Sequence, residues 1–355
     1  MILRWWERRR GSGEKSAGTS APTSVGVPVG GTVLVLGVLS VLLGLVSLAV
    51  GSHSLTLEEV AGAFVPGRTT VASVIVWQLR MPRTVLAVMV GASLAVAGVV
   101  MQGLTRNPLA EPGILGINAG ASLSVVLSMS LLGLTDVSDF LWFAFAGAAL
   151  AAGLVHLMSV RSADAGPARL VLAGVALGAS LRSITGTITM YDSVTFDSYR
   201  FWVLGSLADR DAVLLVWVAP FLVVGLVLAL ASGLTLNALA LGEEQAKALG
   251  VSPRRARALA LTSITLLCGA STAAVGPISF VGLVVPQVLR LALGADQRRL
   301  LAVSLVAGPV LLLAADVVGR VILDSGEMEA GVVTAFIGGP VLLLMVIQRM
   351  GAKGR

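Results

Sequence analysis

Two apolar runs joined by a proline-bracketed polar turn constrain the fold of this chain more than any other feature. The first run, 84–104, is long enough to cross a lipid bilayer, and the second, 113–134, begins only a few residues later. The joining segment, 106–112, reads RNPLAEP, and its two prolines cannot both lie inside a regular helix. We therefore predict a helical hairpin in a membrane, with its turn on one aqueous side.

Further apolar runs extend this prediction to the whole chain. Only 12% of the 355 residues are charged, whereas soluble domains carry about 25%, and the mean hydropathy is +0.93. We predict an all-α polytopic membrane protein with about ten transmembrane helices, the seventh and eighth separated by Gly276-Pro277. The predicted spans are 31–51, 84–104, 113–134, 140–160, 170–190, 212–233, 258–275, 280–293, 300–323 and 331–349.

The distribution of basic residues predicts the orientation. Residues 1–30 read as a basic flexible cytoplasmic tail, and 31–350 form the transmembrane domain. The first apolar run is long enough to span, so we expect a retained helix and not a cleaved signal peptide. With both termini in the cytoplasm, all but seven of the 25 Lys and Arg residues lie inside, which predicts multi-pass insertion in the cytoplasmic (inner) membrane. The net charge of +6 therefore suits a lipid surface and not nucleic acid. The remaining seven cations are Arg68, Arg80, Arg83, Arg182, Arg200, Arg210 and Arg320.

An internal echo points to a repeat. The pattern GASxAxxG occurs at 91–98 and again at 269–276, and Pro108 and Pro286 are separated by the same shift. On the predicted topology the two copies run in opposite directions, as in an inverted repeat. Chance among the 41 glycines is the alternative.

Three segments outside the predicted spans carry helix signals. Thr56 can cap a short helix that has Glu58 and Glu59 in its first turn. Segment 191–211 has the aromatic and charged composition of an interfacial helix. Inner loop 234–257 predicts one short helix ending at Gly250 and a second opened by Ser252-Pro253, which together form a projecting docking surface.

The motifs taken together resemble those of the FecCD-type permeases, the membrane subunits of bacterial ABC importers for iron–siderophore complexes, haem and cobalamin. The chain carries RMPR, GASLAVAG, RNPLAEPGILG, LGEEQAKALG, GPISFVGLVVPQVLR, GADQRRLL and AADVVGR in the family's order. The resemblance implies a type II ABC importer permease architecture and a dimer with a second permease subunit, identical or paralogous. It also implies a cytoplasmic ABC ATPase dimer, an extracytoplasmic substrate-binding protein and a ferric siderophore as cargo, with haem or cobalamin as alternatives.

The sequence predicts a transporter subunit and not an enzyme. Segment 11–16, GSGEKS, lacks the Gly-Lys-Ser/Thr ending of a phosphate-binding loop, and we expect no cofactor and no metal site. Cys268, the one cysteine, is expected to be a buried core residue. The energy for transport must come from a partner ATPase or from an ion gradient, so an ion-coupled secondary transporter is the alternative function.

The resemblance assigns roles at both ends of the molecule. Arg80, Arg83 and Arg320 match positions that dock carboxylates of the binding protein, although snorkelling to head groups is the alternative. Asn107 and Leu109 match the cytoplasmic gate, and a purely structural turn is equally compatible. The residues expected to couple the permease to its ATPase are Glu243, Glu244, Lys247, Leu249, Gly250 and Val251.

Two charged residues within the spans need partners. Arg182 lies about 18 Å into the fifth span, at ~1.5 Å per residue, and we expect it either to face anionic cargo in the pathway, to snorkel, or to pair with Asp192. Asp316 lies four residues before Arg320, which predicts a local ion pair on one helix face.

Overall fold

Every regular element in the part of the chain that the structure describes is a helix. The structure is a computed structural model that describes residues 28–51, 54–65, 67, 70–160, 167–323 and 326–353, so most of the predicted basic tail lies outside the described residues. The elements are α2 (Val29–Ala49), α3 (Leu57–Ala63), α4 (Val71–Val74), η1 (Ile75–Arg80), α5 (Met81–Thr105), η2 (Pro112–Leu115), α6 (Ile117–Leu132), α7 (Val137–Val160), α8 (Pro167–Tyr191), α9 (Ser193–Val203), α10 (Ala212–Ala231), α11 (Gly233–Ala240), α12 (Glu243–Ala248), α13 (Pro253–Val275), α14 (Val281–Leu293), α15 (Gln297–Val321) and α16 (Ala330–Lys353).

The predicted fold class and the ten helical spans are confirmed. Eight of the described helices are long and apolar enough to cross a membrane, and α6 and α14 are shorter apolar helices that occupy the third and eighth predicted positions. Gly276, with φ +78°, ends α13 as predicted, because its Cα lies against the backbone carbonyl of Trp202 and no side chain fits there.

The second span starts earlier than predicted. A continuous helix runs over residues 71–105 and includes the π-helical turn η1 directly before Pro82. In this wider turn the N–H of Met81 bonds to the carbonyl of Val76, five residues back. The altered bonding pattern accommodates the proline ring without ending the helix. The RMPR motif therefore lies inside a helix, although its proline led us to predict that the span starts after it.

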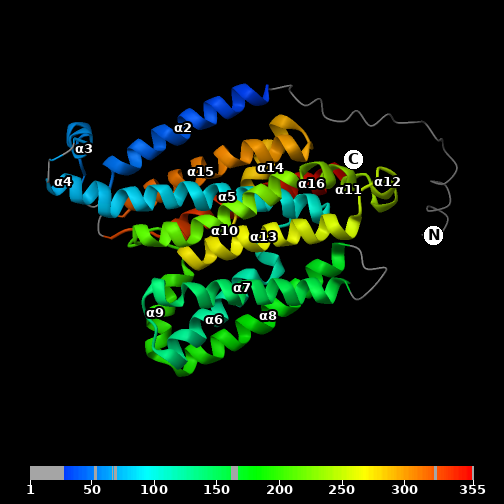
Figure 1. Cartoon of the computed structure of the whole chain (residues 1–355), viewed down its shortest axis with the longest axis horizontal. Coiled ribbons are helices and arrows are strands. Elements are labelled where there is room, and N and C mark those ends of the chain that lie inside the picture. The colour runs from blue at the N-terminus through cyan, green and yellow to red at the C-terminus, as the bar shows by residue number, and fades with distance from the viewer. Residues whose placement is uncertain are drawn as a thin grey trace, which may run out of the picture.

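Helix α5 lies at the centre of the molecule, and α2 lies at its edge (Figure 1). The most apolar window of α5 is 83% buried, against 11% for that of α2. Two glycines allow this packing. A Cβ at Gly91 would lie 2.7 Å from the carbonyl oxygen of Gly308 on α15, and one at Gly98 would collide with the backbone of Gly282 on α14.

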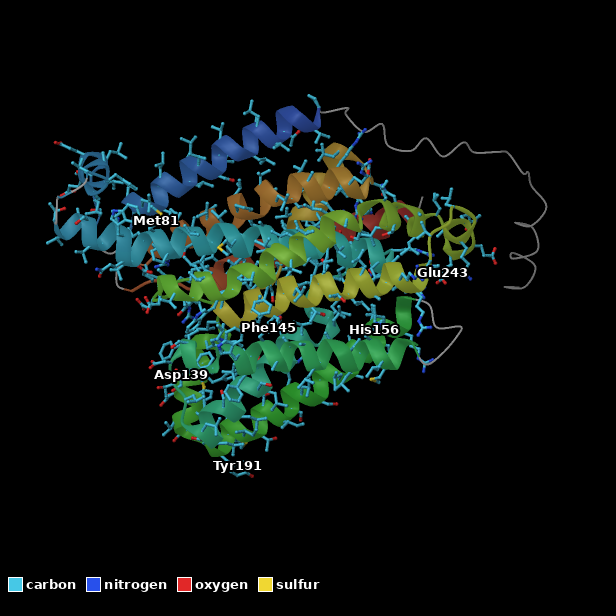
Figure 2. The ribbon with its side chains drawn as sticks, viewed as in Figure 1. Met81, Asp139, Phe145, His156, Tyr191 and Glu243 are labelled. Carbon is cyan, nitrogen blue, oxygen red and sulfur yellow. The ribbon has the colours of Figure 1, made fainter. Side chains whose placement is uncertain are left out.

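A second group of helices, α6 to α9, packs beside this central group (Figure 1). An aromatic seam joins the two groups. The rings of Phe145 on α7 and Phe221 on α10 have centroids 4.6 Å apart, and Trp142 contacts both Phe221 and Trp217. Figure 2 shows Phe145 at the junction between the two groups.

The GASxAxxG echo lies on helices that pack against each other in opposite directions (Figure 1). The first copy occupies the middle of α5, and the second occupies the last turns of α13, up to Gly276. The antiparallel arrangement is the one that an inverted repeat requires.

The inner loop differs in part from the prediction. Helix α12 is the expected short helix, but Ser252-Pro253 opens α13, the seventh span itself, and not a second short helix. The span therefore begins five residues before the predicted 258, because the basic residues after Pro253 extend the helix out of the apolar region. The other short helix of the loop is α11, which follows α10 directly.

Candidate functional site

The short helices outside the long spans lie at two opposite ends of the molecule. Helices α3, α4 and α9 lie at one end, and α11 and α12 lie at the other (Figure 1). The predicted short helix at Thr56 is confirmed as α3, where Thr56 and Glu59 form a reciprocal capping box. The predicted interfacial helix of segment 191–211 is α9, in which Trp202 is buried and Phe201 is exposed.

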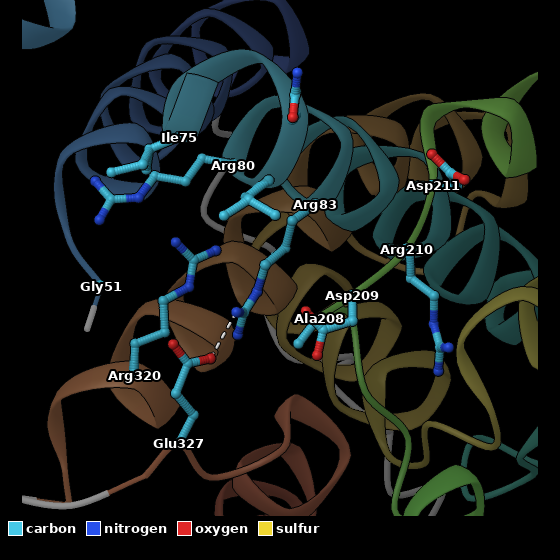
Figure 3. A pocket seen from close by; sticks show the side chains of 12 residues that line it. Gly51, Ile75, Arg80, Arg83, Ala208, Asp209, Arg210, Asp211, Arg320 and Glu327 are labelled. Carbon is cyan, nitrogen blue, oxygen red and sulfur yellow. Dashed lines mark hydrogen bonds and ion pairs between the residues drawn. The ribbon is translucent and has the colours of Figure 1, made fainter. Parts of the chain in front are cut away.

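A charged cavity of about 470 Å³ opens at the α9 end (Figure 3). We call it the arginine basin. Its lining residues are Gly51, Ile75, Gln78, Leu79, Arg80, Arg83, Ala208, Asp209, Arg210, Asp211, Arg320 and Glu327. The basin therefore gathers the three arginines predicted to dock a partner, together with one cation and three acids that the sequence did not single out.

Asp316 holds two of the arginines that line the basin. Its Oδ1 accepts hydrogen bonds from Arg83 Nε and Nη2, at 3.0 and 2.8 Å, and its Oδ2 accepts from Arg320 Nη2. Arg83 Nη1 also donates to Glu327 at 2.6 Å. The Asp316 and Arg320 side chains are each 1% exposed, so these are buried ion pairs with fixed geometry. The predicted Asp316–Arg320 pair is confirmed.

The arginines of the basin also bond to the last turn of α2. Arg320 Nη1 donates to the carbonyls of Ser47 and Val50, at 2.7 and 3.1 Å, and Arg80 Nη1 donates to that of Leu48 at 2.6 Å. These carbonyls end a helix and have no partner within it, so the guanidiniums supply the missing donors. All three predicted docking arginines are thus engaged within the chain in this conformation.

The opposite end carries a small projecting unit formed by α11, α12 and the start of α13, which we call the knob. It has its own apolar centre of Ala238, Leu239, Ala246 and Ala256, on which Val251 packs. An ion pair between Glu243 and Arg257 ties α12 to α13. Figure 2 shows Glu243 at this projecting end.

The predicted coupling residues divide between the surface and the support of the knob. Glu244, Lys247, Leu249 and Gly250 are exposed, whereas Glu243 and Val251 are half-buried and hold the knob together. Leu241, which the sequence reasoning missed, is 63% exposed, and Leu249 is 64% exposed. The signal that could have found it was an isolated leucine directly before Gly242, whose φ of +120° begins the tight turn into α12.

The hinge after α5 is a true chain reversal. Arg106 adopts a left-handed conformation, and the exposed Asn107 side chain accepts the N–H of Leu109 at 3.1 Å. This bond supports the turn interpretation of Asn107. The chain then passes back along α5, where the Glu111 carboxylate accepts the backbone N–H of Phe280, the residue directly before α14, at 2.6 Å. Sequence reasoning did not identify this contact between residues 169 positions apart.

Arg182 lies on the exposed side of α8. Among the described residues no ion pair joins it to Asp192, because Asp192 caps α9 by accepting from Thr195, and ten helical residues separate the two by ~15 Å. The pairing alternative is therefore wrong. Ser180, Ser183 and Thr187 are also exposed on α8, but at about 100° per residue they lie roughly 100–160° around the helix from Arg182, and the hydroxyls of Ser180 and Thr187 bond to carbonyls of the same helix.

The described residues contain no group of three His, Cys, Asp or Glu side chains placed to hold a metal ion. Cys268 is buried in α13, as expected.

Comparisons with known proteins agree with these features. The model of the FecCD transport family matches residues 38–348. The ferric enterobactin transport system permease FepD of Escherichia coli is 44% identical over 302 residues, which cover 84% of this chain and 90% of that protein. The vitamin B12 import system permease BtuC of Yersinia pseudotuberculosis is 42% identical over 285 residues, which cover 78% of this chain and 83% of that protein. An inward-facing structure of a metal-chelate type ABC transporter superposes with a TM-score of 0.79 at 28% identity, covering 90% of this chain and 99% of the other.

Proposed function

This chain belongs to the FecCD transport family and is an inner-membrane ABC importer permease, and from that premise we propose that it moves a ferric siderophore across the membrane. The observation that carries the proposal is the 44% identity to a ferric enterobactin permease over most of both chains. Permeases of this family are transport proteins that work with an ATPase and a substrate-binding protein. A cobalamin permease of similar identity makes cobalamin the cargo to test against.

The proposed orientation puts the knob in the cytoplasm. Arg254, Arg255, Arg257, Arg298 and Arg299 lie in or next to the knob, and such clusters favour the cytoplasmic side. The α9 end, with the arginine basin, then faces outward, and both termini are cytoplasmic.

The knob is the proposed contact for the ATPase. It exposes two leucines, Leu241 and Leu249, and the charged side chains of Glu244 and Lys247, on a unit held by the Glu243–Arg257 pair. An apolar anchor with a polar rim is the usual composition of a binding surface. Closure of the ATPase dimer would move the knob and shift the permease between two conformations.

The arginine basin is the proposed contact for the binding protein. It is concave, lies at the end opposite the knob and mixes guanidiniums with carboxylates, which suits a protein surface of complementary charges. Asn107 and Leu109, at the hinge on the knob side, are the proposed inner gate.

The pathway is proposed to run along the exposed side of α8 that carries Arg182, covered by a second permease subunit, identical or paralogous. A charged side chain within a span usually faces a partner or a water-filled cavity, and Arg182 would meet anionic groups of the cargo there. Arg182→Ala should slow uptake of an anionic ferric chelate about tenfold relative to a neutral one, and equal rates for both cargoes in this variant and the wild type would remove Arg182 from the pathway.

Transport in proteoliposomes tests the function. The permease is reconstituted with its ATPase and a binding protein loaded in turn with a ferric siderophore and with cobalamin. We expect uptake of the ferric siderophore that needs ATP and is unaffected when the proton gradient is collapsed. Uptake that survives without ATP and stops with the gradient would favour a secondary transporter, and faster uptake of cobalamin would overturn the proposed cargo.

A further inference from the structure

Arg210 differs from the other arginines of the basin in having no partner. Its guanidinium forms no hydrogen bond and no ion pair with any described residue, and its Nε is buried without an acceptor. Asp209 precedes it, but its left-handed backbone, with φ +54°, turns the two side chains apart (Figure 3). Burial lowers the pKa of Arg210 to about 10, and the nearby Asp209 only partly opposes this effect. The side chain is a desolvated cation that lacks the anion it needs.

The neighbouring arginines cannot accept a new anion without losing contacts. Arg320 is bonded to Asp316 and to the end of α2, and Arg83 is bonded to Asp316 and Glu327. Releasing Arg83 or Arg320 would break an ion pair with Asp316 at a buried site, and releasing Arg80 would remove the donor to the Leu48 carbonyl. Arg210 is the arginine of the basin that could accept a carboxylate and break no described contact.

A second cavity, of about 460 Å³, lies next to the basin and shares part of its lining. The residues common to both cavities are Arg83, Ala208, Asp209, Arg210 and Glu327. Arg210 therefore stands on the partition between two open chambers. The second chamber adds apolar and aromatic side chains, including Phe140, Phe201 and Trp202, and the hydroxyls of Ser198 and Ser206. A side chain that enters to meet Arg210 could be surrounded by residues of both chambers. These residues would exclude water, which strengthens an ion pair.

We propose that Arg210 receives an aspartate or glutamate carboxylate from the extracytoplasmic binding protein, and that it is the first guanidinium of the basin to do so. This inference rests on the proposed function. The charges around Arg210 favour a protein over free anionic cargo, because Asp209, Asp211, Glu327 and Glu329 lie beside it in the two chambers. They offset the charge of the four arginines that line the same chambers, so no net positive charge attracts a free anionic chelate, whereas a protein surface can bring cations to these acids together with its own carboxylates.

The binding affinity between the two proteins tests the proposal. The permease–ATPase complex is held in lipid nanodiscs, and the dissociation constant of the loaded binding protein is measured for the wild type and for Arg210→Gln and Arg210→Lys. We expect Arg210→Gln to weaken binding about tenfold to a hundredfold, and Arg210→Lys to weaken it less because the charge is kept. Arg200→Gln is the matched control, since Arg200 is 51% exposed on α9, where it pairs with Asp197 and lies over the ring of its neighbour Phe201. It should stay within about twofold of the wild type.

Two further measurements separate charge pairing from damage to the fold. The salt dependence of binding between about 50 and 300 mM NaCl should be shallower in Arg210→Gln than in the wild type, because one ion pair is lost. Replacing the surface carboxylates of the binding protein one at a time should identify one whose effect is not additive with Arg210→Gln.

Each outcome bears on the inference separately from the proposed function. Wild-type affinity in Arg210→Gln, or additive effects for every partner carboxylate, would overturn it while leaving ATP-driven uptake intact. Unchanged affinity with lost uptake would also overturn it and would assign Arg210 to the cargo. A wild-type complex that neither binds the loaded protein nor responds to ATP would refute the proposed function itself.

Discussion

Replacing Asp316 by asparagine should destabilise the protein more than any exposed substitution. The carboxylate accepts three hydrogen bonds from the guanidiniums of Arg83 and Arg320, and it is 1% exposed. An asparagine keeps the shape but removes the charge, so two buried cations lose their shared anion. Breaking a buried ion pair costs about 3–5 kcal/mol. We expect the lower part of this range, because Arg83 keeps Glu327 and Arg320 keeps the α2 carbonyls.

The chain provides its own reporter for this measurement. Cys268 is the one cysteine in the sequence and is 2% exposed in α13, so a fluorogenic maleimide reacts only when the helix bundle opens. At about 2 °C per kcal/mol, a loss of about 3–4 kcal/mol in Asp316→Asn should lower the melting temperature by about 6–8 °C. Asp139→Asn, an exposed carboxylate at the start of α7, is the matched control and should change it by about 1 °C or less.

A double variant refines the test. In Arg83→Gln/Asp316→Asn one of the two stranded cations is also removed, so the loss should be smaller than the sum of the single losses, with a coupling of about 1–3 kcal/mol. The reasoning is refuted if Asp316→Asn melts within about 1 °C of the wild type, or if the two single effects simply add.

Gly98→Ala should abolish the monodisperse peak in size-exclusion chromatography, because the methyl group would enter the backbone of Gly282, whereas Gly37→Ala, with open space around it, should leave the peak unchanged. Glu243→Gln should weaken binding of the ATPase about tenfold in a titration, because α12 loses its tie to Arg257; an unchanged affinity would show that the knob is held by its apolar centre alone. The hydrogen bond from Asn237 holds the pKa of Asp296 below its usual value, so the stability it supplies is present above about pH 4 and is lost as the pH falls through the lowered folded-state pKa. Thermal unfolding followed by tryptophan fluorescence should therefore show a steeper acid loss in the wild type than in Asp296→Asn, and parallel curves would contradict this.

Local patterns made most of the fold predictable from the sequence. Apolar length located the helices, and the short-range signals at Thr56, Gly276 and the Asp316–Arg320 pair all correspond to observed contacts. The capping box at Thr56 and the Asp316–Arg320 pair each join residues no more than four positions apart, where helix geometry alone decides which groups meet.

The contacts that could not be predicted join distant parts of the chain. Arg83 meets Glu327 across 244 positions, and Glu111 meets the N–H of Phe280 across 169. Nothing in either local sequence specifies the partner. The early start of the second span was missed for a different reason, since Pro82 normally ends a helix and the π-helical turn before it removes that constraint. The proposed roles of the docking, gate and coupling residues remain predictions.

The bonds between the arginines and the end of α2 have a consequence for biosynthesis. The first spanning helix leaves the ribosome long before Arg320 is made, so the carbonyls of Ser47 and Val50 must wait in the membrane for a donor almost at the far end of the chain. Only when α15 inserts can Arg320 donate hydrogen bonds to the carbonyls of Ser47 and Val50. A nascent chain interrupted before this point would hold its first helix loosely and expose it to the proteases that survey unfinished membrane proteins.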